Sequence, residues 1–195
     1  MATPTYSLSL DEFRRYAQSG NLIPLYREIL ADYETPVSAF AKIDHGPSAY
    51  LLESVQGGEK WARYSFLGSG SPILMVEDRG DLLIKEGKRT RRIACNGAPL
   101  DRLREFMETY HPVTVPGLPR FVGGAVGYLG YDMVSTCANI SVRRKESLNL
   151  PEFAFLLTDT LLIFDNVAQK IKVVANAHVA SQSERTIRQA YRQAT

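Results

Sequence analysis

The stretch Ile73-Leu74-Met75-Val76-Glu77-Asp78-Arg79-Gly80-Asp81-Leu82-Leu83-Ile84-Lys85 indicates the fold class of this chain. Two short apolar segments, Ile73–Glu77 and Leu82–Lys85, flank residues that are typical of a hairpin turn. A hairpin joins antiparallel strands, because parallel strands need a much longer crossover connection. The stretch therefore predicts an antiparallel sheet, with Arg79-Gly80-Asp81 as part of a turn rather than an adhesion motif.

Further strands and helices are predicted on both sides of this hairpin. The strands are Leu25–Leu30, Tyr50–Val55, Arg63–Leu67, Lys88–Ala94, Phe121–Tyr128, Phe153–Leu157, Leu161–Phe164 and Ile171–Val174. The helices are Ser9–Gly20, which opens with a capping box of Ser9 and Glu12, a helix from Thr35-Pro36 through Phe40, Leu100–Tyr110 and Ser183–Gln193. Because strands and helices do not alternate regularly, we expect an α+β fold with a largely antiparallel, sandwich-like sheet flanked by helices.

Composition predicts one domain, 1–195, without a strong charge. The chain has 195 residues, of which 45% are hydrophobic, and 23 basic against 21 acidic residues. Because the charges nearly balance, no strong electrostatic field favours the binding of nucleic acid or anionic lipid. The basic run Lys88–Arg92 is predicted to be a solvated edge strand. The most apolar stretch, Phe153–Phe164, is too short to span a bilayer, and no signal peptide is recognisable. We therefore expect a cytoplasmic protein with no membrane partner.

Catalytic and metal-binding patterns are absent from the sequence. The three histidines, His45, His111 and His178, are not spaced as metal ligands or as a nucleophile–base pair. Cys95 and Cys137 do not form a metal-binding or redox motif. We therefore predict no catalytic residue and no metal ligand in this chain.

Two further segments have structural interpretations. Gly123–Gly130 is rich in glycine but lacks the lysine and the spacing of a phosphate loop, so we predict a strand that another backbone or a large ring approaches closely. The polar segment Thr136–Leu150 is the best candidate for a mobile surface loop. Within it, Asn139-Ile140-Ser141 matches the glycosylation pattern by chance in a protein without a secretory route.

The segment from Tyr50 to Gly68 carries the candidate binding residues. Two strands joined by a turn at Gly57-Gly58 would place Leu52 and Ser54 on one face. Arg63 and Ser65 could bring a cation and a second hydroxyl to that face, and such groups suit an amino acid with an apolar body. The alternative is an ordinary strand pair in the core.

Five blocks in this order resemble the N-terminal region of anthranilate synthase component I. They are Pro24–Ile29, Thr35–Phe40, Leu51-Leu52-Glu53-Ser54, Arg63–Gly68, and Phe121-Val122-Gly123-Gly124 through Tyr131-Asp132. The resemblance implies the fold of that enzyme's N-terminal domain. It also implies conversion of chorismate to anthranilate with Mg²⁺ and with ammonia from a glutamine amidotransferase subunit, component II.

The resemblance also implies feedback inhibition by L-tryptophan. The inhibitor-binding residues would be Leu52, Glu53, Ser54, Arg63, Tyr64 and Ser65, with Lys60 as the alternative cation to Arg63. Inhibition would follow from thermodynamic coupling, because tryptophan and chorismate favour different arrangements of the enzyme.

Members of that family are much longer than this chain. Their chorismate and Mg²⁺ sites lie in a C-terminal chorismate-binding domain, so we expect this chain alone to be inactive and expect that domain to be its partner. Two alternatives remain open from the sequence: the same region of aminodeoxychorismate synthase component I, and a free-standing amino-acid-binding module.

Overall fold

The computed structural model describes residues 6–46, 48–53, 63–96, 98–138 and 150–195. Contacts group the chain into two compact units, each built around its own sheet. The first unit comprises Met1–Gly70, Tyr110–Gly124 and Asp159–Thr195, and the second comprises Ser71–Thr109 and Ala125–Thr158. The sequence did not predict this subdivision, and the assignment of 1–195 as a single regulatory-type domain stays a prediction.

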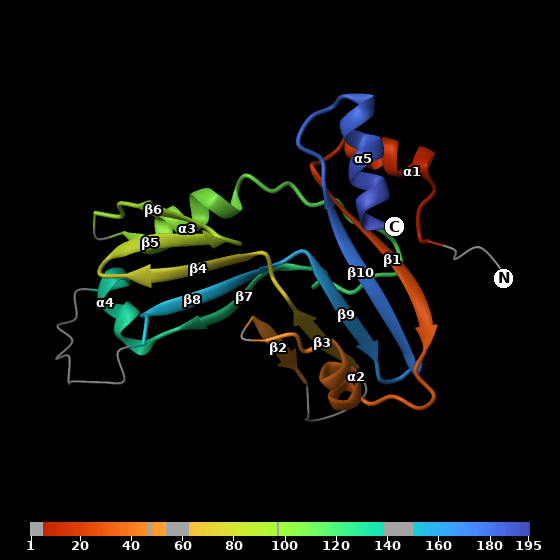
Figure 1. The fold of residues 1–195 in the computed structure, drawn as a ribbon, viewed down its shortest axis with the longest axis horizontal. Coiled ribbons are helices and arrows are strands. Elements are labelled where there is room, and N and C mark those ends of the chain that lie inside the picture. The colour runs from red at the N-terminus through yellow and green to blue at the C-terminus, as the bar shows by residue number, and fades with distance from the viewer. Residues whose placement is uncertain (1–5, 47, 54–62, 97, 139–149) are drawn as a thin grey trace. The chain divides into compact units, whose positions relative to one another are not determined.

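The sheet of the first unit has the strand order β1-β10-β9-β3-β2 (Figure 1). Its strands are β1 (Leu22–Leu30), β2 (Ala49–Leu52), β3 (Tyr64–Ser69), β9 (Thr160–Asp165) and β10 (Lys170–His178). All four pairings between neighbouring strands are antiparallel. β1 is longer than predicted and includes Pro24, which an edge strand tolerates because one side of its backbone needs no partner strand.

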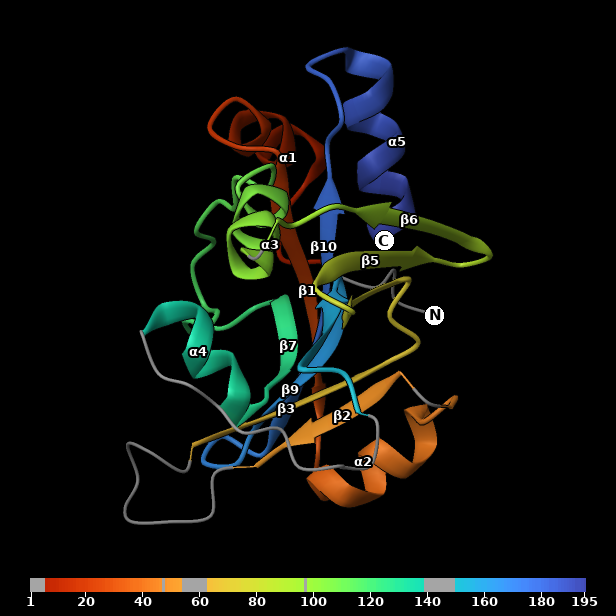
Figure 2. The ribbon, with the colours of Figure 1, turned by 90° about the vertical axis from the view of Figure 1, so that its left-hand side faces the viewer.

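Three helices cover this sheet: α1 (Leu10–Ala17), α2 (Pro36–Ile43) and α5 (Glu184–Ala194). α1 begins at the predicted capping box, in which Glu12 N donates to Ser9 Oγ and Ser9 N donates to the Glu12 carboxylate. α2 begins as predicted, with Thr35 as its N-cap and Pro36 as its first residue. Figure 2 shows α2 beside β2, at the other end of the sheet from α1 and α5.

The core of the first unit has three parts. Phe13 of α1 is fully buried with Ile23 of β1 and Ile187 of α5, and the ring of Phe13 meets Tyr191 edge-on at 5.4 Å between centroids. α2 packs on a cluster that contains Leu67 and Phe164. A third cluster, around Ile163, lies against residues of the segment Tyr110–Gly124.

The sheet of the second unit has the order β6-β5-β4-β8-β7. Its strands are β4 (Ile73–Asp78), β5 (Asp81–Glu86), β6 (Arg89–Ile93), β7 (Gly124–Leu129) and β8 (Phe153–Thr158), and its helices are α3 (Pro99–Met107), the 3₁₀ turn η1 (Tyr131–Met133) and α4 (Val134–Cys137). The predicted hairpin is present: Arg79 and Gly80 join β4 to β5, with φ of 56° and 85°. The basic strand β6 lies at an edge of the sheet, as predicted.

The glycine-rich segment forms the expected strand with a close backbone approach. A side-chain carbon on Gly127 would lie 1.9 Å from the carbonyl oxygen of Ala154 on β8. Just after β7, Gly130 N donates to the carbonyl oxygen of Glu152, the residue before β8. The partner number thus falls from 154 to 152 as the chain advances from 127 to 130, which is an antiparallel arrangement. The prediction that missing side chains admit a neighbouring backbone is therefore confirmed at Gly127.

The α+β class with antiparallel sheets and flanking helices is confirmed, whereas a face-to-face sandwich of the two sheets stays a prediction. The predicted loop Thr136–Leu150 begins inside α4, so residues 136 and 137 are helical where a loop was expected. Residues 139–149, which contain Asn139 and most of that loop, lie outside the described residues. No helix in the described ranges is long and apolar enough to cross a membrane.

Candidate functional site

The described candidate residues lie on, or directly beside, the edge strand β2 and its neighbour β3 in the first unit's sheet. Leu52 is the last residue of β2, and its side chain is 44% exposed. In the antiparallel register Leu52 lies opposite Phe66, and Leu51 lies opposite Leu67. Side chains of paired residues share a face, so Leu52 and Phe66 lie on one face and Leu51 lies on the face covered by α2.

This register corrects the predicted placement of Ser65. Because faces alternate along a strand, Ser65 lies on the same face as Leu67, opposite to the face of Leu52. Ser65 is only 2% exposed, and its hydroxyl accepts a hydrogen bond from the Asn166 side chain at 3.3 Å. The expectation that Ser65 shares the face of Leu52 was therefore wrong, and Tyr64 and Phe66 occupy that face instead.

Phe66 is an apolar residue of the site that the sequence interpretation missed. Its ring meets Phe121 edge-on, with 5.1 Å between centroids and 88° between planes. Together with the half-exposed Leu52 and the partly buried Tyr64, it forms an apolar surface at the sheet edge. The signal that would have found it is the pairing register, which the alternation within one strand does not supply.

Arg63 is held by a carboxylate. Its Nε lies 3.1 Å from both oxygens of Asp165, and its Nη2 lies 2.7 Å from Oδ2. Its guanidinium also lies over the ring of Tyr64, 5.0 Å from the centroid. The Arg63 side chain remains 44% exposed, so it orients Tyr64 while one side of it faces solvent.

Asp165 is the buried centre of this arrangement, with a side chain only 4% exposed. Besides Arg63, its Oδ1 accepts hydrogen bonds from the backbone N–H groups of Val167 and Ala168, at 3.2 and 3.0 Å. Burial opposes ionisation, but the bonds from Arg63 and from these amides outweigh it, so the pKa of Asp165 is lowered. The pair therefore fixes the end of β3 to the turn between β9 and β10.

The remaining predicted residues are at the margin of the described chain. Glu53 follows β2 and is exposed. Ser54 and Lys60 lie outside the described residues. The structure thus brings Leu52, Tyr64 and Arg63 to one end of the β2–β3 pair, and the role of each predicted residue in binding an inhibitor stays a prediction.

A buried cation lies on the same rung of the sheet as Leu52. The register aligns Leu52, Phe66, Ile163 and Lys172 in turn across β2, β3, β9 and β10. The Lys172 side chain is 9% exposed, forms an ion pair with Glu28 and lies 4.8 Å from the centre of the Tyr26 ring. Lys172 and Glu28 are 144 residues apart, so sequence alone gave no signal for this pair.

The Lys172–Glu28 pair predicts a loss of stability in acid. Hydrogen bonding from Lys172 is the main cause that lowers the pKa of Glu28 below its ordinary value of 4.5. Stability from a lowered carboxyl pKa is fully present above 4.5 and is lost as pH falls through the lower value of the folded state. We expect wild type to be more stable than Glu28→Gln at pH 7 and this advantage to shrink by pH 3, as measured by urea unfolding. A constant difference would contradict the prediction.

The described residues contain no group of His, Cys, Asp and Glu that could hold a metal ion. The His178 ring packs beside Tyr110, with 5.4 Å between centroids, which is a structural role. The carboxylate of Asp165 is engaged by Arg63 and by two backbone amides, which is a structural arrangement.

The chain is similar in sequence to known proteins named anthranilate synthase component 1. The chain is 40% identical over 178 residues to anthranilate synthase component 1 of Acetivibrio thermocellus, which covers 91% of this chain and 36% of that protein. It is 41% identical over 185 residues to the protein of the same name from Pseudomonas aeruginosa, covering 90% of this chain and 36% of the relative. The chain is similar to the N-terminal third of anthranilate synthase component I.

A solved structure supports the likeness to anthranilate synthase component I. The crystal structure of that protein from Streptococcus pneumoniae matches with a TM-score of 0.51 and 25% identity, over 85% of this chain and 35% of the other. No family model matches the chain. The chain thus spans about one third of the length of the anthranilate synthase components that it matches.

Proposed function

We propose that this chain is the N-terminal part of an anthranilate synthase component I, which converts chorismate to anthranilate in tryptophan biosynthesis. The observation that carries the proposal is a match over about nine-tenths of the chain, at 40–41% identity, to proteins of that name. The same name belongs to the matched crystal structure. These names favour anthranilate synthase over the aminodeoxychorismate branch.

The chemistry of the reaction is assigned to the rest of the protein. The described residues offer no metal-binding group, so they do not fit a Mg²⁺ site, and no reaction step is placed in this chain. Chorismate, Mg²⁺ and the amidotransferase subunit, component II, are proposed partners of the full-length enzyme, and its proposed location is the cytoplasm. The N-terminal part contributes regulation.

The test of this assignment is the fluorescence of anthranilate. We expect the full-length protein to form anthranilate from chorismate, Mg²⁺ and ammonium, and we expect the 195-residue chain alone to form none. Formation of aminodeoxychorismate by the full-length protein would instead assign it to the folate branch. Turnover by the chain alone would overturn the division of roles.

The edge of β2 and β3 is the proposed wall of a tryptophan site. Leu52, Tyr64 and Phe66 supply an apolar surface, and Glu53 and Ser54 continue the chain at its margin. Arg63 positions Tyr64 and keeps part of its charge exposed, which suits a ligand carboxylate. Ser65 supports this wall from the opposite face, through its bond with Asn166.

A bulky side chain at position 54 should relieve inhibition by tryptophan. We expect Ser54→Phe in the full-length enzyme to raise the tryptophan concentration for half-inhibition roughly 10- to 100-fold, because overpacking a site costs about 1–3 kcal/mol. The activity without tryptophan should stay near that of wild type, because the reacting groups are proposed to lie in the rest of the full-length enzyme. Inhibition curves with L-tryptophan measure the effect.

The matched control is Ser19→Phe. Ser19 is an exposed serine of the same unit, in the turn that follows α1. Its substitution should leave the half-inhibiting concentration unchanged. An unchanged curve for Ser54→Phe itself would remove Ser54 from the inhibitor site.

A further inference from the structure

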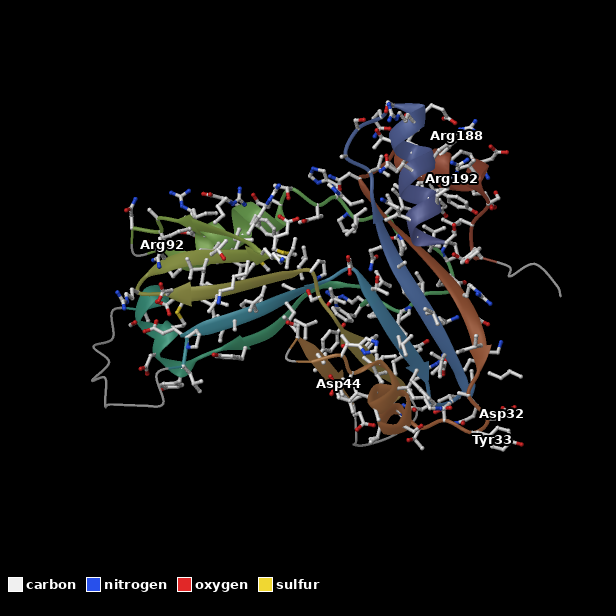
Figure 3. All side chains as sticks on the ribbon, viewed as in Figure 1. Asp32, Tyr33, Asp44, Arg92, Arg188 and Arg192 are labelled. Atoms are coloured by element: carbon white, nitrogen blue, oxygen red, sulfur yellow. The ribbon has the colours of Figure 1, made fainter. Side chains whose placement is uncertain are left out.

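The two edges of the second unit's sheet differ in their protection against pairing. β6 has the sequence Arg89-Thr90-Arg91-Arg92-Ile93, and four of its five residues are exposed. Figure 3 shows Arg92 on this edge, where it forms ion pairs with Asp78 and Asp81. Charged side chains on an edge strand oppose the addition of another strand.

β7 forms the opposite edge and has no such protection. Its sequence, Gly124-Ala125-Val126-Gly127-Tyr128-Leu129, contains no charge and no proline. An edge strand without these devices is an open template, because its outward N–H and C=O groups lack strand partners. Among the described residues, β8 is the only strand paired with β7.

Apolar side chains are exposed along this edge and beside it. Tyr128 is 44% exposed and Leu129 is 53% exposed, while Tyr131 and Leu150 nearby reach 88% and 67%. The Tyr128 hydroxyl donates to Pro151 O at 3.0 Å, so part of this apolar group is held in a fixed position. An apolar group of this kind next to an open edge is typical of an interaction surface.

We propose that β7 is a docking edge, which receives an added β-strand from the remaining part of the same full-length polypeptide. This inference rests on the proposed function. In the matched relatives nearly two thirds of the polypeptide lies outside the matched part. In a full-length protein of that kind, this remaining part is covalently attached and can supply the added strand. A strand is the occupant that satisfies an open edge, and main-chain hydrogen bonds give such pairing its affinity.

The attached occupant is favoured over a second copy by effective concentration. A segment on the same polypeptide has an effective concentration on the order of millimolar, whereas the binding of a second copy is limited by the concentration of the protein in solution. The protected β6 edge also makes pairing of β6 with the β7 of another copy unfavourable. The added strand would link this unit to the part of the enzyme that is proposed to bind chorismate.

Hydrogen–deuterium exchange in the full-length protein tests the proposal. We expect amides of 124–130 to exchange at least about tenfold more slowly than those of 88–93, because an added strand protects one edge and not the other. Equal, fast exchange at both edges would overturn the proposal. Protection of β7 that disappears on dilution would assign the edge to a second copy and would also overturn it.

A variant pair separates docking from general destabilisation. Leu129→Lys places a charge on the β7 edge and should lower the protection of 124–130, whereas Val167→Lys, at a 61% exposed apolar residue of the other unit, should not. Loss of protection in both variants, or in neither, would contradict the assignment.

The identity of the occupant is read by cross-linking. p-Benzoyl-phenylalanine in place of Leu129 should cross-link, on irradiation, to a peptide of the same polypeptide beyond residue 195. Cross-links confined to 1–195 would overturn the proposal. Hydrogen exchange and cross-linking do not depend on catalysis. If the full-length protein made no anthranilate, the proposed function would be overturned, but strand docking at β7 could still be tested by both measurements.

Discussion

Gly127→Ala is expected to lower the free energy of unfolding by about 3 kcal/mol, the upper end of the cost of overpacking. The added carbon would lie 1.9 Å from Ala154 O and 2.8 Å from the Cα of Phe155. Both contacts are with backbone, which cannot rotate away, so β7 and β8 must separate. Gly127 does not have a positive φ, so the effect arises from the contact and not from backbone strain. Urea unfolding followed by circular dichroism measures it.

Gly130→Ala is the graded control for this prediction. Its added carbon would lie 3.0 Å from Glu152 O, a distance that a small shift relieves. We expect a loss of about 1 kcal/mol or less. Equal losses in the two variants would show that the strand spacing adapts and that the close approach at Gly127 is not required.

Asp165→Ala is expected to cost about 3 kcal/mol, because it leaves a buried site with unsatisfied donors. The carboxylate accepts bonds from Arg63 and from the amides of Val167 and Ala168, and its side chain is 4% exposed. Arg63 can regain water, since it is 44% exposed, so most of the loss comes from the two amides and from the end of β3. Thermal unfolding should show a lower midpoint.

Glu184→Ala is the matched control for the buried pair. Glu184 forms ion pairs with Arg14 and Arg188, but its side chain is 52% exposed. An exposed pair contributes about 0–1 kcal/mol, so its removal should change the midpoint little. A similar loss in Asp165→Ala and Glu184→Ala would mean that burial adds nothing to the Arg63–Asp165 pair.

The local elements were predictable because their signals lie within a few residues. Ser9 with Glu12, Thr35 with Pro36, and Arg79 with Gly80 each determine a cap or a turn by short-range hydrogen bonds and φ preferences. The contrast between charged β6 and glycine-rich β7 was also visible in the sequence.

The pairing of distant strands was not predictable from such signals. Alternation shows which residues of one strand share a face, but the register decides which neighbour they meet, and a shift by one residue reverses the face. Ser65 was misplaced for this reason, because Leu52 pairs with Phe66. The Arg63–Asp165 pair joins residues that are 102 positions apart in the sequence, and no local sequence pattern predicts it.

The full-length pairing of β1 with β10, from Leu22 opposite His178 to Leu30 opposite Lys170, has a consequence for biosynthesis. At about 5–20 residues per second, a ribosome completes the partner strand on the order of 10 s after β1 has been made. During that interval the apolar residues Ile23 and Leu25, which are buried in the finished protein, are without their partner strand. Slower translation lengthens the time for which these apolar side chains stay unpaired.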